Sequence, residues 1–122
     1  MAEDHQTQTI TQLEELANGQ NFDMIVITGG EPLMYDLDVL TLALMRAGKS
    51  THVETAGVYP ISGHWDWICF SPKKFKEPLE EYYQRADELK VVIYHPSDLK
   101  WAQAHANKMS ASSNLYLQPD WP

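Results

Sequence analysis

Short apolar runs alternate with helical patterns along most of this chain, and this alternation constrains the fold more than any other feature. The runs predict strands over residues 24–27, 52–55, 67–70, 89–94 and 115–117. Helices are expected over 11–18, 37–47, 79–85 and from 96 or 97 to 107. Strands that alternate with helices imply parallel βαβ units, either in an open sheet or in part of a barrel.

The spacing of apolar residues supports these helices. Leu37, Leu40 and Leu44 form one helical stripe, and Gly48 is placed to end that helix. In the last predicted helix, Leu99, Ala102 and Ala106 fall on one face. The chain shows no repeat of fixed period and no low-complexity linker.

Composition sets limits on the class of protein. The 122 residues, 43% of them hydrophobic, are enough for one ordinary core, so we expect a single domain over residues 1–122. There are 9 basic and 17 acidic residues, a net charge of −8, and the acidic residues are scattered along the chain. This balance argues against a nucleic-acid partner. No run is long and apolar enough for a membrane span, so a cytoplasmic protein is expected.

Two small features of the composition bear on chemistry. Lys73, Lys74 and Lys76 form a basic patch that could meet an anionic small molecule. Cys69 is the single cysteine, so it cannot form an internal disulfide, and alone it cannot hold a structural zinc or an iron-sulfur cluster. We interpret it as a buried small residue of a strand.

Polar or glycine-containing groups follow most of the predicted strands. In parallel βα folds, chemistry collects at the carboxyl ends of the strands. The groups at these ends are residues 28–32, 54–57, 71–73, 94–96 and 118–120.

The first of these groups carries the strongest signal. Gly29 and Gly30 follow a buried strand and expose backbone groups without a Cβ, Glu31 adds a carboxylate, and Pro32 fixes the exit of the turn. A glycine pair alone could simply make a tight turn. The whole string from Thr28 resembles the Gly-Gly-Glu-Pro element of radical S-adenosylmethionine (SAM) enzymes, where that strand end binds the methionine moiety of SAM.

This resemblance implies an α/β fold, a partial (βα)6 TIM-like barrel of parallel strands that alternate with helices. It also implies a reaction that begins when a reduced [4Fe-4S] cluster splits SAM into methionine and a 5′-deoxyadenosyl radical.

Further strings narrow the resemblance to the 7-carboxy-7-deazaguanine synthase family. They are Val-Glu-Thr-Ala-Gly over 53–57, Phe-Ser-Pro-Lys over 70–73, Ala-Asp-Glu-Leu-Lys over 86–90, and Leu-Gln-Pro-Asp over 117–120. The implied activity is that of a lyase that contracts 6-carboxy-5,6,7,8-tetrahydropterin to 7-carboxy-7-deazaguanine, with loss of ammonia, in the route to queuosine. Magnesium would help to hold this pterin substrate.

The resemblance also assigns residues to roles. Thr28 would touch the substrate. The SAM site would be formed by Gly29, Gly30, Glu31, Pro32, Ser71, Pro72 and Lys73, and it would be closed by Gln118, Pro119 and Asp120. Lys73 could instead be a solvated surface lysine, and Ser71 could serve only to form a turn. Glu54 and His52 share a strand face, and we expect a polar contact for Glu54 and an ordinary strand position for His52.

The sequence departs from the family at both ends. The family holds its cluster with three cysteines near the N-terminus, and neither these nor the magnesium ligands are present. We therefore expect a fragment that is incomplete at both ends and inactive alone, and otherwise a degenerate, non-catalytic SAM-fold remnant that acts as a binding module. A glycyl-radical activating enzyme is a further alternative, against which the Ser-Pro-Lys string argues. A homodimer is possible.

Overall fold

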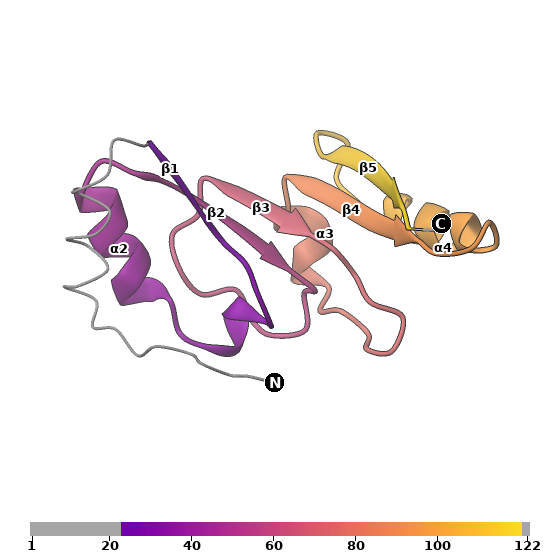
Figure 1. Ribbon diagram of the computed structural model, residues 1–122, viewed down its shortest axis with the longest axis horizontal. Coiled ribbons are helices and arrows are strands. Elements are labelled where there is room, and N and C mark those ends of the chain that lie inside the picture. Colours follow the sequence, from indigo (N-terminus) through magenta and orange to yellow (C-terminus); the bar gives the residue numbers. More distant parts are fainter. Residues whose placement is uncertain (1–22, 121–122) are drawn as a thin grey trace.

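The computed structural model describes residues 23–120, and the helix expected over residues 11–18 lies outside them. Within this range the chain forms a five-stranded sheet in which every neighbouring pair is parallel and the strands follow in chain order (Figure 1). The strands are β1 (Met24–Ile27), β2 (Ser50–Thr55), β3 (Trp67–Phe70), β4 (Glu88–Ile93) and β5 (Asn114–Pro119). Each strand expected from the sequence is confirmed, and the predicted parallel alternation with it.

The three expected helices that fall within residues 23–120 are also present, with shorter bounds. They are α2 (Asp38–Arg46), α3 (Glu81–Arg85) and α4 (Asp98–Ala106), and a short 3-10 helix, η1 (Pro32–Met34), was not foreseen. One face assignment is wrong: Leu99 is 49% exposed, whereas Ala102 of the same helix is buried. Among the described helices, none has the length and apolar character needed to cross a bilayer.

The strand order places the apolar core on one face of the sheet. Parallel strands joined in chain order by right-handed crossovers carry their connections on the same side. The side chains that point to that side include Val53, Phe70, Leu89 and Val91, and all are buried in one cluster. In Figure 1 helix α3 lies behind β3 and β4, on this covered side.

The opposite face of the sheet carries a different set of side chains. His52, Glu54 and Lys90 alternate with the core residues of β2 and β4, and all three are partly exposed. No described helix packs over them. Parallel sheets are ordinarily buried on both faces, and a barrel buries the second face by closing on itself. The polar face is therefore the one that would line the inside of a barrel.

The crossover from β2 to β3 does without a helix. Its residues, 56–66, are held by hydrogen bonds to buried threonines: Thr41 Oγ1 accepts from the His64 amide at 2.8 Å, and Thr51 Oγ1 donates to the His64 carbonyl at 2.6 Å. The Asp66 carboxylate accepts from the Thr51 amide at 2.8 Å. These bonds fix an irregular segment in the place that a crossover helix would otherwise occupy.

Strand β5 is the least covered part of the sheet. All six of its residues are exposed, including Leu115 and Leu117 on the side that faces the core in the other strands. It is also an edge strand of the described sheet. An exposed apolar edge strand favours pairing with another β-strand.

Gly57 links the turn after β2 to the centre of the core. Its φ of +79° suits glycine, and a Cβ there would lie 2.7 Å from Phe70 Cε1 and 3.2 Å from Tyr82 Cγ. Both rings are fully buried, with their centroids 5.5 Å apart. The turn can therefore approach the core only because residue 57 has no side chain.

We predict that Gly57→Ala destabilises the fold more than Gly48→Ala does. Gly48 has a similar φ of +77°, but a Cβ there would meet no atom within 4 Å. Both variants bear the strain of the left-handed backbone, about 1 kcal/mol, and only the first adds a steric clash, a further ~1–3 kcal/mol. Urea unfolding monitored by circular dichroism measures the difference, and equal losses would contradict the packing described for Gly57.

Candidate functional site

The carboxyl ends of β1, β2 and β3 meet around a small polar cavity. Its volume is about 80 Å³, and its walls come from Thr28, Gly29, Gly30, Glu31, Glu54, Thr55, Ala56, Ser71 and Lys73. Six of these nine residues are site residues predicted from the sequence. The structure thus brings together the predicted groups after β1 and β3, which lie on either side of β2 in the sheet.

The turn after β1 presents bare backbone to this cavity. Gly29 has a φ of +109°, which favours glycine, whereas Gly30 does not have a positive φ. A Cβ built at Gly30 would meet no protein atom within 4 Å. Packing therefore does not require glycine at position 30, and the space beside it is open to a ligand.

Glu31 fastens this turn to the end of β2. Its carboxylate accepts hydrogen bonds from the Thr55 hydroxyl at 2.7 Å, from the Ala56 amide at 2.9 Å and from the Leu33 amide at 3.1 Å. The last bond caps η1, which Pro32 begins. Thr55 is buried, so its hydroxyl needs such an acceptor. Glu31 builds the site, and its part as a direct ligand contact stays a prediction.

The Ser71–Lys73 segment forms the wall after β3. Ser71 is 3% exposed, and its amide donates to the Thr55 carbonyl at 2.8 Å. Lys73 Nζ lies 3.3 Å from Ser71 Oγ, to which it donates. Lys73 is only partly exposed and lines the cavity, so it is not a fully solvated surface lysine. The pair offers a hydroxyl and an ammonium to the cavity.

A second, more apolar cavity adjoins the first at Lys73. Its volume is about 240 Å³, and it is lined by Pro72, Lys73, Lys74, Phe75, Val92, Tyr94 and Trp101. Lys74 Nζ pairs with the Asp98 carboxylate and lies 5.6 Å from the centre of the Trp101 ring. That ion pair, together with the Tyr94 and His95 amides, holds the pKa of Asp98 below its ordinary value.

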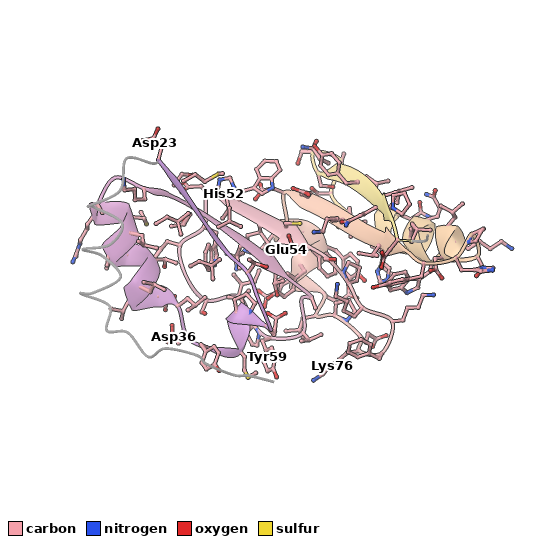
Figure 2. All side chains as sticks on the ribbon, viewed as in Figure 1. Asp23, Asp36, His52, Glu54, Tyr59 and Lys76 are labelled. Carbon is pink, nitrogen blue, oxygen red and sulfur yellow. The ribbon has the colours of Figure 1, made fainter. Side chains whose placement is uncertain are left out.

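The basic patch of the sequence is thus divided among different partners. Lys74 forms an ion pair with Asp98, Lys73 lines the polar cavity, and Lys76 Nζ lies 5.6 Å from the centre of the Tyr59 ring. Figure 2 places Lys76 and Tyr59 near one another, at the lower edge of the view.

Glu54 is the main residue of the cavity that the sequence-based site omitted. It stands at the end of β2, lines the cavity, and accepts a hydrogen bond from Lys90 Nζ at 2.8 Å. The expected polar contact is confirmed, and so is the ordinary place of His52, whose ring stacks on Trp67. The sequence had placed residues 54–57 among the strand-end groups, but the family resemblance gave Glu54 no ligand role.

Other predicted residues lie outside this cavity. Gln118 and Pro119 are the last residues of β5 and Asp120 follows them, and β4 separates β5 from β3. Pro32 is buried at the start of η1, and Pro72 lines the apolar cavity. Their assignment to a ligand stays a prediction.

Metal ligands do not gather in the part of the chain that is described. No group of three or more histidine, cysteine, aspartate or glutamate side chains is placed to hold a metal ion among residues 23–120. Cys69 is buried in β3, as expected of a small strand residue. Burial, aided by the neighbouring Glu88 carboxylate, raises the pKa of its thiol to about 12. A thiol with that pKa is neutral at physiological pH and a poor ligand.

We predict that Glu31→Gln lowers the free energy of unfolding by about 1–3 kcal/mol, because charge-assisted bonds to a buried hydroxyl and two amides are weakened. Urea unfolding measures the change. Glu77→Gln, at an exposed loop residue, is the matched control and should change it by less than about 0.5 kcal/mol. Equal effects in the two variants would show that Glu31 does not fasten the turn.

Comparison with known proteins places this geometry in a family. No protein-family model matches the sequence. The chain is 45% identical over 117 residues to the 7-carboxy-7-deazaguanine synthase of Synechocystis sp., which covers 96% of this chain and 56% of that protein. It is 48% identical over 97 residues to the synthase of the same name from Flavobacterium psychrophilum, covering 80% of this chain and 46% of that protein.

The fold comparison agrees. The crystal structure of QueE from Escherichia coli superposes with a TM-score of 0.80 at 28% identity, covering 93% of this chain and 54% of that one. The chain spans about half the length of the relatives it matches. By sequence and by its parallel α/β fold, the chain belongs to the 7-carboxy-7-deazaguanine synthase family.

Proposed function

We propose that the polar cavity at the carboxyl ends of β1, β2 and β3 is a SAM site, and that the chain provides this site in a radical SAM lyase that forms 7-carboxy-7-deazaguanine. The observation that carries the proposal is Gly30: it lines the cavity, although among residues 23–120 neither packing nor backbone conformation demands glycine there. A residue kept bare beside a polar cavity fits close approach of a ligand.

The chemistry of the cavity walls suits the polar groups of SAM. SAM carries a carboxylate, an ammonium, a ribose and a sulfonium, so its site needs both donors and acceptors. The turn at Gly29 and Gly30, the Ser71 hydroxyl and the Lys73 ammonium supply donors, and Glu54 supplies an acceptor. Thr28, on the same wall, is proposed to contact the pterin substrate.

The proposed place of Gln118, Pro119 and Asp120 is the far end of the ligand. They lie at the carboxyl end of β5, beyond the apolar cavity at the ends of β3 and β4. A ligand held at the glycine turn would have to extend past Lys73 and Tyr94 to reach them. SAM, with its adenine at the opposite end from its carboxylate, has the required elongated shape.

The iron-sulfur cluster does not fit the residues of this chain. Its chemistry in the family is to supply the electron that splits SAM, and it needs three cysteine ligands. The 122 residues contain one cysteine, which is buried and neutral. The proposed role of these residues is therefore to bind and orient SAM and substrate. Magnesium likewise finds no ligand group among residues 23–120.

The alternatives draw less support. A glycyl-radical activating enzyme shares the glycine turn, but the relatives named above are synthases. A non-catalytic SAM-binding remnant rests on the missing cysteines alone. We propose further that the protein acts in the cytoplasm on a small pterin, without direct contact with nucleic acid, and that it forms a homodimer.

We predict that SAM titrated into the 15N-labelled chain shifts the amide resonances of residues 28–31, 54–56 and 71–73. Gly30→Ala should weaken this binding at least about tenfold, because a methyl group at this cavity-lining position would occupy space proposed for the ligand. The melting temperature should stay within about 2 °C, because that methyl meets no protein atom. Unshifted spectra at millimolar SAM, or wild-type affinity in Gly30→Ala, would refute the proposed site.

Activity can be tested in a chimera. The matching segment of the Synechocystis synthase is replaced by this chain, so that the relative's remaining segments are kept. We expect formation of 7-carboxy-7-deazaguanine, detected by mass spectrometry, within about tenfold of the parent rate, and its loss when Gly30→Ala is added. A folded chimera that binds SAM without forming product would separate the binding proposal, which would stand, from the lyase proposal, which would fail.

A further inference from the structure

An ion pair crosses one strand of the sheet on the polar face. Lys90 Nζ of β4 lies 2.8 Å from Glu54 Oε1 of β2, and β3 runs between these two strands. The side chains are 23% and 39% exposed, so water screens the pair only in part. Figure 2 shows Glu54 over the middle of the sheet, away from the helices behind it.

Cys69 leaves the space for this crossing. It pairs in register with Glu54 on one side and with Glu88 on the other, so its side chain lies on the same face, beneath the path of the Lys90 side chain. It is small, 7% exposed and neutral. A longer side chain at position 69 would fill the gap over β3 that the two charged groups span.

The two residues of this ion pair differ in their position relative to the polar cavity. Glu54 lines the polar cavity, and Lys90 does not. Among residues 23–120, Lys90 is the hydrogen-bond partner found for the Glu54 carboxylate, and it takes Oε1. Burial works against the charge of Lys90, but the hydrogen bond and negative charge of Glu54 outweigh it and raise the pKa of the ammonium above its ordinary value.

Stability gives a weak reason for such a pair. A partly exposed ion pair contributes little to folding, and ordering two long side chains costs rotamer entropy. Orientation gives a stronger reason. A bond from Lys90 to Oε1 restricts the rotamers of Glu54 and leaves the second carboxylate oxygen of this cavity-lining residue for another donor.

We propose that Lys90 is a positioning residue that reaches across Cys69 to hold the Glu54 carboxylate, so that Glu54 accepts a hydrogen bond from an N–H or O–H group of the bound ligand. The identity of the ligand rests on the function proposed above, whereas the positioning itself does not. Two sources offer such donors: the ribose hydroxyls and ammonium of SAM, and the amino-pyrimidinone edge of a pterin.

The test compares Lys90→Met, which keeps the length of the side chain without its charge, with Lys90→Arg, which restores a cation. Lys100→Met, an exposed lysine of α4, is the matched control. The first readout is the rotamer of Glu54, from side-chain couplings measured by NMR on the chain without ligand. Averaging in Lys90→Met alone is expected, and an unchanged single rotamer would overturn the proposal.

The second readout is the affinity of each variant for SAM and, separately, for 6-carboxy-5,6,7,8-tetrahydropterin. We expect Lys90→Met to bind one of them about tenfold more weakly, with Lys90→Arg within about threefold of the wild-type chain and Lys100→Met unchanged. The ligand affected identifies the donor. Wild-type affinity of Lys90→Met for both ligands, or a loss that Lys90→Arg does not reduce, would overturn the proposal.

The failures of the two proposals can be told apart. If the wild-type chain binds neither ligand, the proposed SAM site fails, and the rotamer of Glu54 still decides whether Lys90 positions it. If the wild-type chain binds SAM and Lys90→Met leaves both rotamer and affinity unchanged, the site stands and the role of Lys90 falls. Melting temperatures of all variants separate either result from loss of folding.

Discussion

Parallel pairing of the strands in chain order is the constraint on which the other features depend. It aligns every carboxyl end along one edge of the sheet and sends the described connections to one face. The first consequence is that groups from three separate stretches of sequence enclose one cavity. The second is that no helix of residues 23–120 covers the face carrying Glu54 and Lys90, so that charged side chains can cross it.

The period of the apolar residues was sufficient to predict most of the fold. All five strands and the three helices beyond residue 36 were expected, because strand and helix periods differ clearly over those runs. Leu99 was misplaced because helical spacing gives the apolar stripe of a helix but not its rotation against the sheet. Ala102 faces inward as expected, with Trp101 in place of Leu99. The 3-10 helix depends on the Glu31 cap, a contact that local periodicity does not reveal.

The site residues that could be predicted are those that have suitable polar or glycine chemistry and also follow a predicted strand. Gly30, Ser71 and Lys73 were selected in advance and meet at the cavity. Glu54 was omitted, since its partner Lys90 lies 36 residues away and two strands distant, and only the register brings the two together. The bonds that Glu31 accepts from Thr55 and Ala56 were not foreseen, because they join the glycine turn to a strand end about 25 residues away, and its contact with a ligand stays a prediction.

The family and the single cysteine set the scope of the chain's role. Relatives about twice as long carry the name of a synthase, while the role proposed for this sequence, with its single cysteine, is to hold and orient small molecules. Binding and orientation are what a protein contributes to cofactor-driven chemistry. Contacts with the ligands can therefore be studied in this chain separately from electron transfer.

Gly57 restricts the substitutions that this protein can accept during evolution. The turn that follows Glu54, Thr55 and Ala56 rests against Phe70 and Tyr82, with no room for a methyl group. A substitution at Gly57 would push the core and the cavity wall apart in one step. Substitutions that most loops accept without harm are therefore not accepted at position 57. A larger residue there would require smaller residues in place of both Phe70 and Tyr82 for the cavity to keep its shape.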